Sequence, residues 1–266
     1  MTRDPRFTFN EVGDDYDRYR PGYPEPLFED LLSLAELSAG ERILEIGCGT
    51  GQATRSVARR GFEISCLEPG PRTAAIARKN LASFPRVDVL CTTFEAWPCE
   101  PEAFGLVFSA QAFHWVPPEI GFAKAAQALR PAGTLAVLGN TEAIERSLHG
   151  DGGGPVSKSL DAAYVRFAPE LLGRPGSRWY AEEGPVPSLF RDSGVFSEVT
   201  ARRYPWSRRF ETSEYLGLLG TFSSHRLLPD ERREPLHAAI AEALDRFGGE
   251  IEIFYEAYLY VGKREG

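Results

Sequence analysis

The chain has 266 residues, of which 42% are hydrophobic and 12% aromatic, enough for a sizeable core and too apolar for a disordered chain. The formal net charge of −8 argues against nucleic acid as the main partner, because an acidic surface repels phosphate backbones. The N-terminus has no signal-peptide core and no apolar run approaches the roughly 20 residues of a membrane span, so we expect a cytoplasmic protein without a membrane partner.

Short apolar strands alternate with helical segments over the first 140 residues. Strands are expected at Arg42–Ile46, Glu63–Leu67, Arg86–Leu90, Leu106–Ser109 and Thr134–Leu138. Helices are expected at Leu27–Leu37, Gln52–Arg60, Pro71–Ala82 and Gly121–Leu129. This alternation predicts βαβ units, and hence an α/β fold with a parallel sheet covered on both faces.

The rhythm changes after Asn140, where helical stretches interrupt the alternation. Two further strands are expected, at Val199–Tyr204 and at Ile251–Val261. We interpret the chain as a single domain, 1–266, with its core at about 27–140, 195–205 and 250–263. The segments at about 141–185 and 206–248 are then insertions that form a cap over the mouth of the site.

A glycine-rich loop follows the first strand directly. Gly47, Gly49 and Gly51 stand between strand and helix, where a tight turn and close backbone approach to a ligand favour glycine. The spacing is GxGxG, so Gln52 occupies the place of the third glycine of a dinucleotide fingerprint, and no GK[ST] of a P-loop follows. Glu68 ends the second strand, where an acid can accept hydrogen bonds from ribose hydroxyls. Together these features indicate a nucleoside-binding site.

On these residues the sequence resembles the class I S-adenosylmethionine (SAM)-dependent methyltransferases, in particular small-molecule enzymes related to ubiquinone-biosynthesis and trans-aconitate methyltransferases. The family's first motif, an acid followed by GxGxG, is matched by Glu45 and the glycine loop. The resemblance implies a Rossmann-like, mostly parallel sheet with an antiparallel last strand, helices on both faces and a helical cap. It also implies SAM as the cofactor and S-adenosylhomocysteine (SAH) as its product.

The resemblance further implies which residues bind the cofactor. Arg20 suits the SAM carboxylate, and Thr93 stands where the family usually has Asp, so it can accept a bond from the adenine amine without a charge. The implied set is Tyr16, Arg20, Glu45, Gly47, Cys48, Gly49, Gly51, Glu68, Pro69, Thr93, Phe94, Glu95, Ser109, Ala110 and Gln111.

The implied acceptor site contains His114, Trp115, Phe222 and His225. His114 matches a position beside the reactive methyl, where it is either a general base or a residue that shapes the pocket. Transfer is expected to depend mainly on positioning, and no metal is expected, because the Asp/Asp/Asn set of catechol enzymes is missing. No NPPY-like tetrapeptide of nucleic-acid enzymes is present either, which indicates a small-molecule acceptor. We expect a monomer or homodimer.

Two alternatives stay open, and the methylated atom (O, N or C) is unresolved. A carboxyl methyltransferase of the trans-aconitate type would need cations in the cap to hold a polyacid, and four arginines are available: Arg174, Arg178, Arg208 and Arg209. A non-catalytic SAM- or SAH-binding regulatory protein would keep the glycine loop but fill the acceptor pocket.

Overall fold

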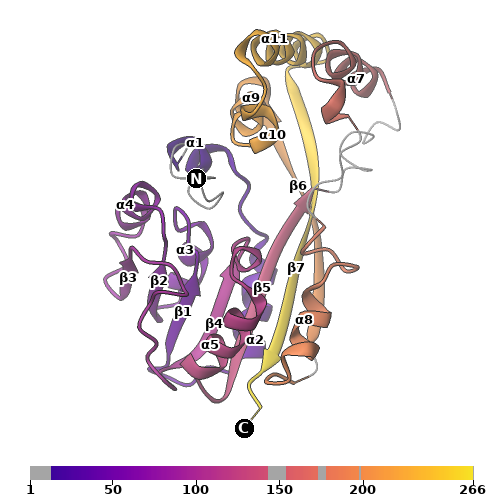
Figure 1. Cartoon of the computed structure of the whole chain (residues 1–266). Coiled ribbons are helices and arrows are strands. Elements are labelled where there is room, and N and C mark those ends of the chain that lie inside the picture. The colour runs from indigo at the N-terminus through magenta and orange to yellow at the C-terminus, as the bar shows by residue number, and fades with distance from the viewer. Residues whose placement is uncertain (1–12, 143–153, 173–177, 198, 266) are drawn as a thin grey trace.

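The computed structural model describes residues 13–142, 154–172, 178–197 and 199–265, and shows a sheet with helices on both faces and a cap at one end (Figure 1). The strands are β1 Arg42–Ile46, β2 Glu63–Leu67, β3 Val87–Leu90, β4 Phe104–Ala110, β5 Leu129–Glu142, β6 Thr200–Glu211 and β7 Glu250–Lys263. The helices are α1 Gly13–Tyr19, α2 Glu25–Ala35, α3 Gln52–Ala58, α4 Pro71–Asn80, α5 Pro118–Ala128, α7 Pro155–Phe167, α8 Val186–Ser193, α9 Thr212–Gly220, α10 Ser223–Arg226 and α11 Asp230–Arg246. Among the described residues, no helix is both long and apolar enough to cross a bilayer.

The sheet has seven strands in the order β3-β2-β1-β4-β5-β7-β6. Strands β1 to β5 pair in parallel, whereas β7 runs antiparallel to both β5 and β6. Strands β1 and β2 have the predicted bounds, and the other predicted strands are all present. The predicted Rossmann-like α/β fold, mostly parallel with an antiparallel last strand, is therefore confirmed.

The last three strands in the sheet order are longer than predicted, and β6 runs furthest past its predicted end. It continues to Glu211, so the prediction that this strand ends at Tyr204 is wrong. The stretch stays extended because its apolar side chains alternate: Trp206 stacks on Tyr255 with ring centroids 5.0 Å apart, and Phe210 is buried in the cap. The positions between them are exposed, namely Pro205, Ser207, Arg209 and Glu211, as an edge strand with one solvated face allows.

Two apolar clusters cover the two faces of the sheet, and a third lies in the cap. Helices α2, α3 and α4 pack on one face, and α5 and α8 pack on the other. The far ends of β6 and β7 rise from the sheet to α7, α9 and α11, which bury their own cluster around Leu218, Leu236 and Ile240 (Figure 1). The long strands thus hold the cap above the carboxyl ends of β1 and β4.

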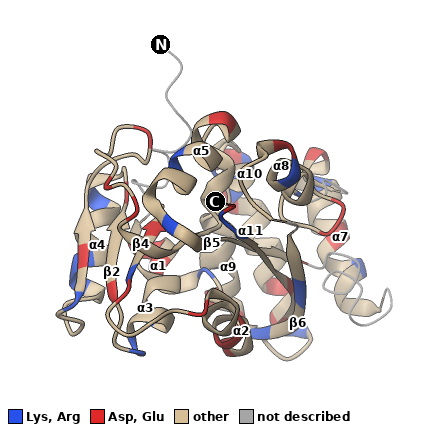
Figure 2. Cartoon of the chain, turned by 90° about the horizontal axis from the view of Figure 1, so that it is seen from below, with Lys and Arg blue, Asp and Glu red and all other residues tan. Residues whose placement is uncertain are grey.

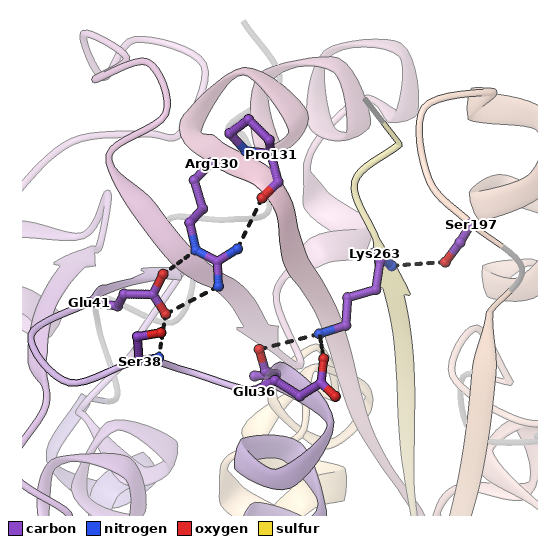
Figure 3. Close-up of polar contacts among 8 residues, drawn as sticks. Glu36, Ser38, Glu41, Arg130, Pro131, Ser197 and Lys263 are labelled. Atoms are coloured by element: carbon purple, nitrogen blue, oxygen red, sulfur yellow. Dashed lines mark hydrogen bonds and ion pairs between the residues drawn. The ribbon is translucent and has the colours of Figure 1, made fainter.

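Ion pairs and hydrogen bonds join the α2–β1 loop to β5 and β7 at the other end of the sheet (Figure 3). Arg130 pairs with Glu41, whose Oε2 also accepts the backbone N–H of Ser38 at 2.6 Å. The ammonium of Lys263 lies 3.0 Å from Glu36 Oε2. None of these residues lines the cavity described below, so their role is structural.

Charged residues are mixed over the surface. Seen from below, basic and acidic segments lie side by side around the rim of the molecule (Figure 2). The chain has 38 acidic and 30 basic residues, which agrees with the view that nucleic acid is not the main partner. That view stays a prediction.

Candidate functional site

A cavity of about 850 Å³ opens at the carboxyl ends of β1, β2 and β4, between the sheet and the cap. This is where open α/β sheets bind their ligands. The cavity is lined by most of the predicted site residues: Tyr16, Arg20, Glu45, Gly47, Cys48, Gly49, Glu68, Pro69, Thr93, Phe94, Glu95, Ala110, Gln111, Trp115 and Phe222. Four predicted residues, Gly51, Ser109, His114 and His225, do not line it.

The glycine loop needs glycine at each predicted position, for different reasons. Gly47, Gly49 and Gly51 have φ of 69°, 58° and 88°, in the left-handed region that other residues rarely adopt. A side chain at Gly47 would collide with Ala112, and one at Gly51 would come within 2.9 Å of Leu81. At Gly49 a Cβ would meet nothing within 4 Å, so the loop presents bare backbone to the cavity there.

Glu45 lies on β1 beneath this loop and is fully buried. Its Oε2 accepts the Thr54 hydroxyl at 2.5 Å, while Oε1 has no hydrogen-bond partner among the described residues. Burial raises the pKa of Glu45 to about 8, because the charged form loses its hydration. The carboxyl is therefore mostly protonated at neutral pH.

Glu68 connects the second strand to the glycine loop. Its Oε2 accepts the N–H of Gly49 at 3.0 Å, and its Oε1 accepts the N–H of Gly70 at 2.8 Å. Burial raises the pKa of Glu68, and these two backbone donors oppose that rise. Each oxygen keeps a free lone pair toward the cavity, so the carboxylate can still accept two ligand hydroxyls.

The loop after β3 forms the wall beside Glu68. Thr93 lines the cavity, but its Oγ1 already accepts the N–H of Ala96 at 3.1 Å. Phe94 is buried and stacks on Trp97, with ring centroids 6.1 Å apart. This wall is therefore a fixed turn with an aromatic base, which suits a planar group such as adenine.

The end of β4 turns sharply at Gln111, whose φ of 56° is left-handed for a non-glycine residue. Its amide side chain donates to the carbonyl of Asn140 on β5. Ser109 faces the other way, donating its hydroxyl to the carbonyl of Ile46 at 2.8 Å, which ties β4 to β1. Gln111 thus lies in the cavity wall while Ser109 is a buried structural residue.

The two histidines proposed for the acceptor site lie behind the cavity wall. Nδ1 of His114 is 2.8 Å from the hydroxyl of Tyr180, and burial lowers the pKa of His114 to about 4. His225 is buried in the cap between Tyr164 and His237, with nitrogen contacts of 3.2 and 3.1 Å. Burial also lowers the pKa of His225 to about 4, so both rings are neutral at pH 7.

Helix α1 joins the glycine-loop side of the cavity to the cap through Arg20. Its Nε donates to Thr221 Oγ1 at 2.8 Å, and Nη2 donates to the Thr221 carbonyl at 3.2 Å. The guanidinium also lies 4.3 Å from the ring centroid of Phe222. On the other side, the Gln52 amide donates to the Arg20 carbonyl at 3.4 Å. Arg20 therefore fastens α9 and α10 over the cavity.

We expect Arg20→Ala to loosen the cap locally. Losing two hydrogen bonds and the ring contact should speed hydrogen–deuterium exchange of residues 218–226 at least tenfold, since each hydrogen bond to a charged group is worth ~1.5–3 kcal/mol. Arg18→Ala, at an exposed arginine of the same helix, is the matched control and should leave this exchange unchanged. Equal exchange rates in the two variants would show that Arg20 does not hold the cap in place.

Apart from Trp115 and Phe222, the residues of the cap half of the cavity were not predicted from the sequence. Asn140 and Glu142 come from the extension of β5, while Tyr255, Glu256 and Tyr258 come from β7. The only available signal was the aromatic alternation of the last strand, which predicted the strand but not its approach to the ligand. Of the four arginines considered for a polyacid, Arg178 lines the cavity, Arg208 and Arg209 do not, and Arg174 lies outside the described residues.

Comparisons with known proteins agree with this geometry. A family model described as a methyltransferase domain matches residues 44–137. An uncharacterized methyltransferase of Mycobacterium tuberculosis (strain ATCC 25618 / H37Rv) is 33% identical over 221 residues, which cover 83% of this chain and 79% of that protein.

Solved structures have the same fold. A "Putative Type II Methyltransferase" from Anaeromyxobacter dehalogenans has a TM-score of 0.64 and 22% identity, covering 92% of this chain and 98% of that one. Haemonchus contortus phosphoethanolamine N-methyltransferase 2, solved with S-adenosyl-L-methionine, has a TM-score of 0.55 and 15% identity, covering 100% of this chain and 61% of that one. The chain belongs to the class I SAM-dependent methyltransferases.

Proposed function

We propose that the protein methylates a small molecule bound between the glycine loop and the cap. The observation that supports this most is the continuity of the cavity. It joins the glycine loop and Glu68 to Gln111 at the end of β4, and then to Phe222 of the cap. A cofactor at one end and an acceptor at the other would meet near Gln111.

The residues at the loop end fit SAM. Two polar atoms there, Glu45 Oε1 and Thr50 Oγ1, are buried without a hydrogen-bond partner among the described residues. Buried polar atoms are normally satisfied, so a polar ligand would complete them. In this proposal Glu68 holds the ribose hydroxyls, Thr93, Phe94 and Glu95 flank adenine, and Tyr16 and Arg20 lie near the methionine carboxylate.

When bound, SAM supplies a methyl group on a positively charged sulphur, which leaves with the electron pair of the carbon–sulphur bond. The chain's part is then to hold the acceptor in line and exclude water, a contribution of roughly 7–11 kcal/mol in well-oriented systems. The fastening of the cap by Arg20 serves that purpose. No metal ion is needed in this proposal, because the leaving group is already activated.

Two glycine variants test the cofactor site. Gly49 and Gly61 both have positive φ, and a Cβ at either meets nothing within 4 Å, so both alanine variants should fold and lose a similar ~1 kcal/mol. Only Gly49 lines the cavity. We expect Gly49→Ala to weaken SAH binding at least tenfold in isothermal titration, whereas Gly61→Ala binds as wild type does.

Wild-type protein, shown to be folded and free of co-purified cofactor, should bind SAH with micromolar affinity, about −8 kcal/mol. Absence of binding would overturn the proposed cofactor site. Equal affinities for the two alanine variants would instead show that the ligand does not approach the loop at Gly49.

A further inference from the structure

The cap half of the cavity is acidic and aromatic. Across the whole lining there are seven glutamates, Glu45, Glu68, Glu95, Glu142, Glu182, Glu183 and Glu256, against three arginines, Arg20, Arg178 and Arg203. The cap half of the lining contains four of these glutamates and four aromatic rings. They are Glu142, Glu182, Glu183 and Glu256, and Trp115, Phe222, Tyr255 and Tyr258. Carboxylates beside aromatic faces are the surroundings that bind organic cations.

Two of the three lining arginines are already paired with carboxylates. Arg203 lies 3.4 Å from Glu256, whose other oxygen accepts the hydroxyl of Tyr258 at 2.7 Å. Arg178 lies 3.6 Å from the exposed Glu183. The charge of each guanidinium is therefore partly offset by a neighbouring carboxylate before any ligand binds.

Glu142 is different, because it lines the cavity and its side chain has no hydrogen bond or ion pair within the described part of the chain. It is the last residue of β5 and pairs in register with Tyr255 of β7, so the two side chains share one face of the sheet. Burial raises the pKa of Glu142, and Arg20 opposes that rise only from a distance, because the hydrogen bonds of its guanidinium go to Thr221. A partly buried carboxylate without a partner favours a ligand that brings a positive charge.

We propose that the methyl acceptor is a small molecule recognised through a protonated amine, with Glu142 as the anionic partner of the ammonium and the ring of Tyr255 beside it. The ammonium is the recognition group; an amine that is itself methylated must first give up a proton, because an ammonium nitrogen has no lone pair. This assignment rests on the proposed function, and it names the class of acceptor that the same cavity takes. It disfavours a polyacid, since an anionic acceptor would face Glu142 and the cap carboxylates at close range.

The test uses SAH-loaded protein and three probes of matched shape: 2-phenylethylamine, 2-phenylethanol and 3-phenylpropanoate. Affinities are measured by ligand-observed NMR titration at pH 7. Wild type should bind the amine at least tenfold more tightly than the alcohol, and the carboxylate most weakly. In Glu142→Gln the amine should lose about tenfold while the alcohol is unchanged. Glu119→Gln, which removes an exposed carboxylate outside the cavity, should behave as wild type.

Each other outcome contradicts the proposal. Equal binding of amine and alcohol, a preference that survives in Glu142→Gln, or no binding of any probe would remove Glu142 as the anchor of a cation. Tightest binding of the carboxylate would favour a polyacid acceptor. SAH titration of the same samples separates this from the proposed function: if SAH binds normally, only the amine proposal fails.

Discussion

In urea unfolding at pH 8, Glu45→Gln is expected to be more stable than wild type by on the order of 3 kcal/mol, whereas at pH 5 the two proteins should differ by less than about 1 kcal/mol. Glutamine keeps the shape of the protonated acid and its carbonyl can still accept the Thr54 hydroxyl. It carries no charge at any pH, so the variant removes the titration, and any cost of the buried amide is independent of pH.

The sign follows from the direction of the shift. Burial raises the pKa of Glu45 to about 8 in the folded protein, above the 4.5 that is ordinary for a glutamate in water. Between these values the folded state holds a proton that the unfolded state has lost. The stabilisation from the neutral acid is therefore complete below about pH 4.5, falls as the pH rises, and is lost through about pH 8.

The decisive measurement is how steeply the free energy of unfolding changes with pH in each protein. Wild type should lose stability from pH 5 to pH 8 more steeply than Glu45→Gln, with Glu119→Gln following wild type as the matched control for one exposed carboxylate. Parallel slopes for wild type and Glu45→Gln would show that Glu45 is ionised in the fold at pH 7. A ligand that hydrogen-bonds to the unpaired Oε1 of Glu45 should also change the slope of the wild-type protein.

The loop end of the site could be predicted from sequence because its residues are local. A strand, three glycines and a helix within a dozen residues determine the turn, and the parallel pairing of β1 with β2 brings Glu68 to the same edge. The short buried strands were predictable for the same reason, since their apolar runs end at turn residues.

The part of the cap half that β5 and β7 form could not be predicted, because it depends on the register between distant strands. Glu142 meets Tyr255 only through the antiparallel pairing of β5 with β7, and both strands run beyond their apolar runs. Polar residues in an edge or protruding strand cannot be told from loop residues in the sequence, because no run of apolar residues marks the strand. The length of β6 was missed for that reason.

The histidines show a second limit of motif reasoning. His114 has the expected place in the chain, but the turn at Gln111 and the short 3-10 helix at Phe113–Trp115 bring its Nδ1 against Tyr180. With a pKa near 4 it is a weak base at neutral pH. Its role as a base stays a prediction, which the position behind the cavity wall does not favour. An amine acceptor would also place the titrating carboxylate, Glu142, nearer the ligand than either histidine.

The second large expected effect concerns the proposed contact between Glu68 and the ribose. We expect Glu68→Gln to weaken SAH binding about 100-fold, because replacing a charged acceptor of two hydroxyls costs on the order of 3 kcal/mol. The substitution also puts an amide where the N–H of Gly49 or Gly70 now donates to the carboxylate, so loss of affinity alone would not separate ligand contact from loop geometry.

Changing the ligand separates these two effects. 5′-Methylthioadenosine and an analogue lacking both ribose hydroxyls, titrated against wild type and Glu68→Gln, form a double-mutant cycle. If Glu68 holds the hydroxyls, wild type should prefer the intact nucleoside strongly and the variant should not, since the analogue has nothing for the carboxylate to accept. If Glu68 only shapes the glycine loop, both ligands should weaken by the same factor and the preference should survive. Such parallel losses would show that the ribose does not bind at Glu68. The comparison of Gly49→Ala with Gly61→Ala would still test whether SAM binds at Gly49.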